Sequence, residues 1–152
     1  MSTQTFRPIW HVYVRNGMVF VPDVARTEAG FFLDVEPVRS AKLSDLQSLA
    51  SAIEEAMAMG NPRVPTPTRA AFPAPVILKP AGLKNWNAFV KRGACFTIFR
   101  DEGGIEITET GCNDDGEWVD DPSLNQKLSG GSPTLDIATR IAERVRRRPD
   151  LV

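Results

Sequence analysis

The chain has 152 residues, of which 42% are hydrophobic, and this size and composition suit one globular domain with one core. Its formal net charge is only −1, yet the charges are separated along the chain. Nine acidic and no basic residues lie from Asp101 to Asp121, whereas seven basic and no acidic residues lie from Ala56 to Arg100. Such blocks bear on binding partners and association rates and say little about the fold.

Two features of the sequence indicate a cytoplasmic location. No apolar run reaches the roughly 18–20 residues that a membrane helix needs. Residues 1–14 lack the charged and apolar regions of a signal peptide. Cys95 and Cys112 are too few for a disulfide framework, so we expect both to be reduced, although a single bridge between them stays open.

Three strands are expected in the first forty residues. Residues 9–15 alternate between two faces, and Asn16-Gly17 is typical of a type I′ hairpin turn. Residues 18–25 form the return strand, ended or bulged at Pro22, and residues 31–38 form a third strand. One apolar and one polar face indicate an antiparallel sheet that is covered on one side.

Residues 43–60 show the strongest helical pattern in the chain. Ser44 with Gln47 forms a possible capping box, and Gly60 is a typical helix end. The expected apolar stripe consists of Leu46, Leu49, Ile53 and Met57. Residues 61–75 contain five prolines, so we expect extended chain there, as a linker or as a strap lying over the domain.

The second half of the chain is expected to return to the sheet and to end in a helix. The predicted elements are a short strand at 76–80, a two-turn helix at 83–93 with Trp86, Phe89 and Val90 pointing inward, a hairpin of 94–101 with 105–110, and a sheet extension at 117–122. Ser132-Pro133 then begins a helix whose apolar stripe is Leu135, Ala138, Ile141, Ala142 and Val145. The prediction is a single α+β domain over 1–152, a mainly antiparallel sheet packed against two to three helices.

Residues 106–122 carry seven acidic side chains, which raises the question of a metal site. An EF-hand alignment with Gly116 at loop position 6 places Gly111 and Pro122 where two of the main calcium ligands should be. An irregular calcium or magnesium site is an open alternative; it would use Asp114, Asp115, Asp120 and Asp121. His11, Cys95 and Cys112 are isolated, which argues against zinc, so the sequence predicts no metal and no cofactor.

Catalysis was considered for the single histidine and for one pair of carboxylates. His11 is expected to be a half-buried sheet residue. Asp34 and Glu36 project from one face of a strand and could run acid–base chemistry, but a solvated face beside Arg15 or Arg39 is the favoured interpretation. The chain has neither a nucleophile elbow nor a phosphate-binding glycine loop, so we expect a protein that is not an enzyme.

Two binding hypotheses follow from the charge blocks. The basic segment 61–100, interleaved with Phe72, Trp86, Phe89 and Phe96, has the composition of a nucleic-acid-binding surface, although its aromatic residues fall at core positions. The acidic segment is suited to a basic protein partner, because opposed potentials speed association and select the partner. The candidate contact residues are Glu106, Glu109, Asp114, Asp115, Glu117, Trp118, Asp120 and Asp121.

Three stretches carry a resemblance to a known family: RTEAGFFLDVEPV (26–38), NPRVPTPTR (61–69) and LKPAGLKNWNAFVKRGACFTI (78–98). Together they resemble the immunity proteins of bacterial contact-dependent growth inhibition systems, and the similarity runs over roughly 8–145. The resemblance implies a cytoplasmic, non-catalytic protein that binds the C-terminal domain of a cognate toxin, often a nuclease, and blocks its active site. Such toxins are commonly basic, which fits the acidic segment.

Overall fold

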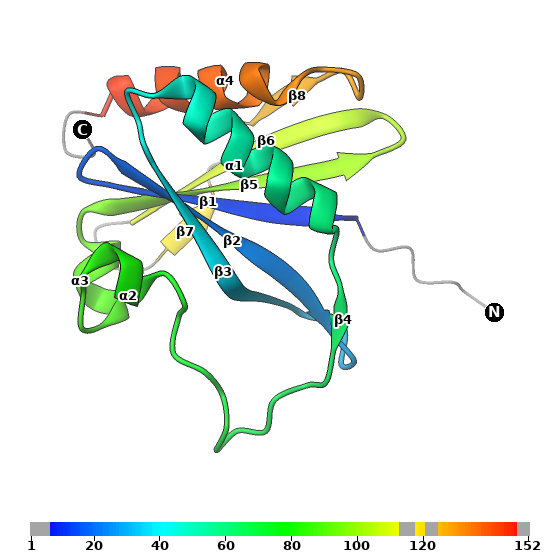
Figure 1. Ribbon diagram of the computed structural model, residues 1–152, viewed down its shortest axis with the longest axis vertical. Coiled ribbons are helices and arrows are strands. Elements are labelled where there is room, and N and C mark those ends of the chain that lie inside the picture. Colours follow the sequence, from blue (N-terminus) through cyan, green and yellow to red (C-terminus); the bar gives the residue numbers. More distant parts are fainter. Residues whose placement is uncertain (1–6, 113–117, 121–124, 149–152) are drawn as a thin grey trace.

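A central sheet organises the molecule and has eight strands in the described part of the chain. Six of them follow in the order β3-β2-β1-β5-β6-β7, while β4 pairs with β2 and β8 with β6. The computed structural model describes residues 7–112, 118–120 and 125–148. The strands are β1 Ile9–Arg15, β2 Met18–Thr27, β3 Phe32–Lys42, β4 Arg63–Val64, β5 Gly93–Asp101, β6 Gly104–Cys112, β7 Trp118–Asp120 and β8 Gln126–Leu128. The helices are α1 Leu46–Met59, α2 Leu78–Ala81, α3 Trp86–Val90 and α4 Thr134–Arg146. Figure 1 shows this α+β arrangement, as the sequence predicts.

Two tight hairpins set the antiparallel register of the central strands. Asn16 and Gly17 have φ of 55° and 75°, the positive values that a type I′ turn requires between β1 and β2. The register of β2 with β3 shifts between Pro22 and Asp23, which confirms the expected bulge. Gly104, at φ 132°, turns β5 into β6. The outer edge of β6 is then shared, because β8 pairs with Ile105–Ile107 and β7 with Thr110–Cys112.

Helices α1 and α4 lie side by side over one face of the sheet and enclose the main core (Figure 1). The predicted stripe of α1 is confirmed, with Leu49 and Ile53 fully buried. Its N-cap is Asp45, which accepts a hydrogen bond from Ser48 N at 3.1 Å, so the predicted Ser44–Gln47 capping box is wrong. In α4 the residue Leu135 is exposed and Ile137 is buried in its place.

The opposite face of the sheet is covered in part by α2 and α3. Tyr13, Phe20 and Cys95 point to that face and form a smaller core with Leu78 and Phe89. The predicted strand at 76–80 is therefore wrong: this segment enters α2, where Pro80 is tolerated because the first-turn amides of a helix lack intrahelical partners. The predicted helix at 83–93 is confirmed over the shorter range of α3, with Phe89 and Val90 buried.

The proline-rich segment is hydrogen-bonded to the sheet at its beginning. β4 pairs in parallel with the end of β2, and Asn61 bonds to the backbone of Ile9 and Val24. Residues 68–75 are exposed, and Phe72 stacks on Phe31 with ring centroids 6.3 Å apart. In the described part of the chain, no helix has the length and apolar character needed to span a membrane.

Candidate functional site

The β5–β6 hairpin carries the first carboxylates of the acidic segment, and basic side chains lie near two of them. Asp101 and Glu106 both lie near Arg7, whose Nη2 is 3.1 Å from Asp101 Oδ2 and 3.7 Å from Glu106 Oε2. Lys127 on β8 stands opposite Glu106 in the strand register. The side chain of Glu106 is 21% exposed. Glu106 is therefore a partly screened carboxylate, although no basic residue lies near it in the sequence.

Glu109 occupies a different environment from the other candidate contact residues. It shares a face of β6 with Ile105 and Ile107, which point toward the helices, and it is only 3% exposed. Its Oε2 accepts a hydrogen bond from Arg144 Nε at 3.0 Å, and its Oε1 lies 3.5 Å from Arg148 Nη1. This pairing with α4 corrects the expectation that Glu109 faces an external partner. Counting acidic residues along the chain could not reveal it, because the countercharges come from the C-terminal helix.

The second half of the acidic block follows directly on the edge of the sheet. Backbone pairing places Trp118 opposite Cys112 and Asp120 opposite Thr110, which confirms the predicted sheet extension over 118–120. The candidate residues Asp114, Asp115, Glu117 and Asp121 lie outside the described residues. The described residues of this part of the acidic segment therefore lie at the edge of the sheet, beside β6.

The basic segment has exposed cations but few accessible aromatic rings. All seven basic residues of this block are exposed; they are Arg63, Arg69, Lys79, Lys84, Lys91, Arg92 and Arg100. Phe89 and Phe96 are 0% and 1% exposed and belong to the two cores, so neither can stack on a base. Phe72 presents ring surface, as do Trp86 and Phe99 in part. The segment thus offers exposed cations, whereas two of its five aromatic rings are closed to the base stacking that single-stranded nucleic acids use.

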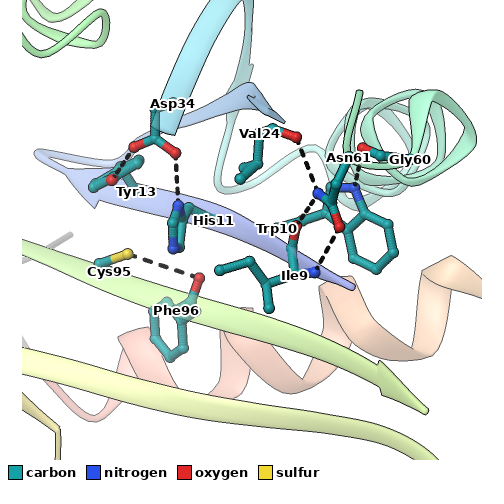
Figure 2. Close-up of polar contacts among 10 residues, drawn as sticks. All are labelled: Ile9, Trp10, His11, Tyr13, Val24, Asp34, Gly60, Asn61, Cys95 and Phe96. Carbon is teal, nitrogen blue, oxygen red and sulfur yellow. Dashed lines mark hydrogen bonds and ion pairs between the residues drawn. The ribbon is translucent and has the colours of Figure 1, made fainter. Parts of the chain in front are cut away.

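A second polar site joins β1 and β3 (Figure 2). Asp34 Oδ1 lies 2.6 Å from His11 Nδ1, and Asp34 Oδ2 accepts a hydrogen bond from the Tyr13 hydroxyl. The expected position of Asp34 on a solvated face beside Arg15 or Arg39 is wrong. Arg39 instead contacts Asp23 at 2.7 Å and Glu55 at 2.9 Å. An alternating strand does place His11 and Tyr13 on one face. Their partner on β3, beyond β2, leaves no signature in the sequence.

The hydrogen-bonding roles in this site follow from the chemistry of the three groups. An ionised carboxylate only accepts, so the hydrogen in this contact lies on His11 Nδ1, and the imidazole in its neutral form keeps a lone pair on its other nitrogen. Burial, followed by the negative charges of Cys95 and Asp34, raises the pKa of Tyr13 well above 10.0, so the phenol remains a donor. The Asp34 carboxylate is thereby held in place from two sides.

The site opens onto a cavity of about 450 Å³ between the sheet and the proline-rich segment. His11, Tyr13 and Asp34 line it together with Phe32, Phe72 and Trp86, and the remaining lining comes from Leu33 and residues 73–75. Both His11 and Asp34 are partly accessible, at 19% and 18% of their side-chain surface. This volume is in the usual range of ligand pockets. A mainly apolar wall around one fixed carboxylate can bind a ligand.

Metal ligands and thiols add no further site in the described ranges. Within residues 7–112, 118–120 and 125–148, no three His, Cys, Asp or Glu side chains are grouped in a way that could hold a metal ion. The irregular site considered for Asp114, Asp115, Asp120 and Asp121 involves residues outside those ranges or side chains that are not described. Cys95 is a buried thiol that is not in a disulfide, so the bridge to Cys112 left open by the sequence is not formed.

Comparison with known proteins shows a shared fold. No family model matches the sequence, and no curated protein matches it. A protein of unknown function from Neisseria meningitidis has a similar structure, with a TM-score of 0.69, 12% identity, and coverage of 97% of this chain and 98% of that chain. A chain of the CdiA-CT/CdiI toxin and immunity complex from Yersinia pseudotuberculosis is similar at a TM-score of 0.64 and 14% identity, covering 94% of this chain and 98% of that one. The chain thus shares a fold, end to end, with a component of a toxin and immunity complex.

Proposed function

We propose that this chain is an immunity protein, which binds a cognate toxin domain and neutralises it without catalysing a reaction. The observation that carries the proposal is the fold shared with a chain of a toxin and immunity complex over 94% of this chain. That likeness does not by itself distinguish toxin from inhibitor. The sequence resemblance to immunity proteins and the long acidic segment favour the inhibitor side.

We further propose that the toxin is basic, that it is a nuclease, and that an acidic surface blocks its active site. A nuclease binds phosphates through cationic groups, so carboxylates presented in their place would compete with the substrate. The proposed contact residues are Asp114, Asp115, Glu117, Trp118, Asp120 and Asp121, with Glu106 at the margin. Glu109 is left out of this set because Arg144 and Arg148 already hold it inside the protein. Inhibition would take place in the cytoplasm of the cell that receives the toxin.

The direct experiment is co-expression with the toxin candidate encoded upstream of this gene. The expected result is that the chain restores growth to cells that make the toxin domain and that the two proteins co-purify as a stable complex. A non-cognate immunity protein is the matched control, since it should neither protect nor co-purify. Growth arrest that this chain does not relieve, together with no complex, would rule out the immunity role for that pair.

A second candidate function, nucleic-acid binding, is favoured by one observation: all seven cations of the basic segment are exposed. Binding through that face would release counterions, so the logarithm of the affinity should fall steeply with the logarithm of salt concentration. Fluorescence anisotropy of the isolated protein with a generic RNA and DNA tests this. Undetectable binding at about 0.15 M salt would remove this candidate, because non-specific nucleic-acid binders still bind in the micromolar range there.

A further inference from the structure

The cavity formed by β1, β3, α3 and the proline-rich segment is lined by groups that share one electrostatic preference. Asp34 supplies a carboxylate, and His11 supplies a ring lone pair in its neutral form. Aromatic rings add negative faces, which attract cations. None of the ten residues that line the cavity is Lys or Arg. Each of these features favours a ligand that is positively charged and donates hydrogen bonds.

The Asp34 carboxylate is already held in a fixed orientation in the protein without a ligand. His11 Nδ1 and the Tyr13 hydroxyl each occupy one oxygen of Asp34, which fixes its orientation and leaves a second lone pair on each oxygen. Tyr13 is itself held by edge-on contacts with Trp86 and Phe89, at centroid distances of 6.1 and 5.8 Å. A fixed acceptor lowers the entropic cost of binding a donor.

The walls of the cavity favour a flat cation over a compact one. Trp86, Phe32 and Phe72 surround the carboxylate, and Phe72 lies on the exposed proline-rich segment, where it is itself 54% exposed. A guanidinium group is planar and weakly hydrated and stacks on aromatic faces, whereas an ammonium group holds its water more strongly. Arginine also forms cation–π contacts more often than lysine.

We propose that this cavity binds an arginine side chain of the protein partner, with the guanidinium bonded to Asp34 and in contact with the rings of both Trp86 and Phe72. The inference rests on the proposed function in one respect: the arginine would belong to the basic toxin. It adds a contact that is formed by β1, β3 and α3 and does not involve the acidic segment. Its recognition chemistry is local, so an isolated arginine in a short peptide is a sufficient probe.

The test uses the full chain and three peptides that differ at one position. NMR follows the Trp86 indole N–H and the His11 ring protons during titration with acetyl-Gly-Arg-Gly-amide, its lysine analogue and its citrulline analogue. Citrulline keeps the shape of arginine and removes the charge, so we expect its dissociation constant to be higher by about 5-fold or more. The lysine peptide is expected to fall between the two. Equal affinity for arginine and citrulline, or no saturable shift at Trp86 and His11, would overturn the proposal.

Two variants locate the binding to these residues. Asp34→Asn removes the charge, and Phe72→Ala removes one wall at an exposed position where loss of the fold is not expected. Each should weaken arginine-peptide binding by about 3-fold or more. The control is Leu135→Ala, which truncates an exposed apolar side chain on α4, away from the cavity, and should leave the binding unchanged. If Asp34→Asn does not fold, Phe72→Ala decides, and unaltered binding to Phe72→Ala would count against the aromatic wall.

Failure of this inference can be distinguished from failure of the proposed function. If the chain protects cells from the toxin but does not discriminate arginine from citrulline, only the proposed arginine site is ruled out. If it binds the arginine peptide selectively but gives no protection and no complex, the proposed toxin binding is ruled out and the arginine site stands.

Discussion

Arg144 Nε donates a hydrogen bond to Glu109 Oε2 at 3.0 Å and so ties helix α4 to strand β6 across the main core. The two residues differ in access to water: the side chain of Glu109 is 4% exposed and that of Arg144 is 19% exposed. Arg148 provides a second, longer contact at 3.5 Å. The carboxylate therefore depends on its partners, whereas a released guanidinium can reach solvent.

Arg144→Leu should lower the free energy of unfolding by about 3 kcal/mol, because it leaves the buried Glu109 carboxylate with only the longer contact to Arg148. Glu109→Leu should cost less, since Arg144 can turn toward water. The double variant should recover much of the loss of Arg144→Leu, as expected when a pair is replaced by apolar side chains. Urea unfolding of the three variants measures this. Strictly additive losses would show that the two residues do not interact.

Stability should depend on the ionisation of Tyr13 at alkaline pH. The folded-state pKa of Tyr13 is raised above its ordinary value of 10.0, so above pH 10 the unfolded state loses a proton that the folded state retains. The Tyr13 contribution is complete below pH 10 and is lost as the pH rises from there through the folded-state pKa, by up to about 1.4 kcal/mol per pH unit. The measurement is urea unfolding of the wild type and Tyr13→Phe between pH 8 and 11. If the difference between the two proteins does not change with pH, burial of this phenol is not linked to folding.

Asn61 should contribute more to stability than its place at a helix end suggests. Its Nδ2 donates to Ile9 O at 2.8 Å and to Val24 O at 3.0 Å, and its Oδ1 accepts from Ile9 N at 3.1 Å (Figure 2). Asn61→Ala leaves three backbone groups without this partner and should cost about 2 kcal/mol. The exposed Asn87→Ala is the control and should stay within about 0.5 kcal/mol.

Asn61→Asp separates the donor from the acceptor. The carboxylate can still accept from Ile9 N but would face two carbonyl oxygens, so no rescue relative to alanine is expected. Thermal unfolding of the three variants in parallel gives the answer. Full stability of Asn61→Asp would contradict a structural role for the two donated bonds.

Gly93 is required by a close approach between β5 and α3. A Cβ there would lie 2.4 Å from Phe89 Cε1 and 2.6 Å from Phe89 O, and Phe89 is fully buried. Gly93→Ala should therefore destabilise the protein by about 2 kcal/mol through overpacking. Gly131→Ala is the matched control, because nothing lies within 4 Å of its Cβ position. The melting temperatures of the two variants should differ by several degrees, and equal values would show that Phe89 can move aside.

The parts of the fold that could be predicted are those with a local signal. The asparagine–glycine turn and the alternation around it specify the β1–β2 hairpin, and the apolar spacing of Leu49 and Ile53 specifies α1. The segment 76–80 is the counterexample. A short apolar run has no readable period, and only its packing under Tyr13 and Phe20 shows that it enters a helix.

The candidate sites were predicted less completely, because their pairings join distant segments. Glu109 counts as one more carboxylate in the sequence, and only the docking of α4 reveals its two arginine partners. Asp34 likewise meets His11 and Tyr13 through the order of strands in the sheet. The sequence did identify the separation of acidic and basic segments, because the order of charges along the chain can be read without knowing the fold.

The proposed acidic surface predicts how binding responds to charge reversal. Lysine at Asp114, Asp115 and Asp120 should raise the dissociation constant of the toxin complex by about 100-fold or more, because truncating one desolvated pair partner already costs about 2–5 kcal/mol. A triple reversal at Glu28, Glu54 and Glu143 is the control. These residues are exposed elsewhere, and the net charge changes equally, so only a small loss is expected.

The most direct test is therefore calorimetric titration of an inactive toxin domain with the wild type and the two triple variants, at several salt concentrations. We expect a large loss of affinity and a flatter salt dependence for the triple variant Asp114→Lys, Asp115→Lys, Asp120→Lys but not for the control variant, since screening acts on the charges that meet the partner. An unchanged dissociation constant for that variant, or equal losses for both, would contradict an acidic toxin-binding surface.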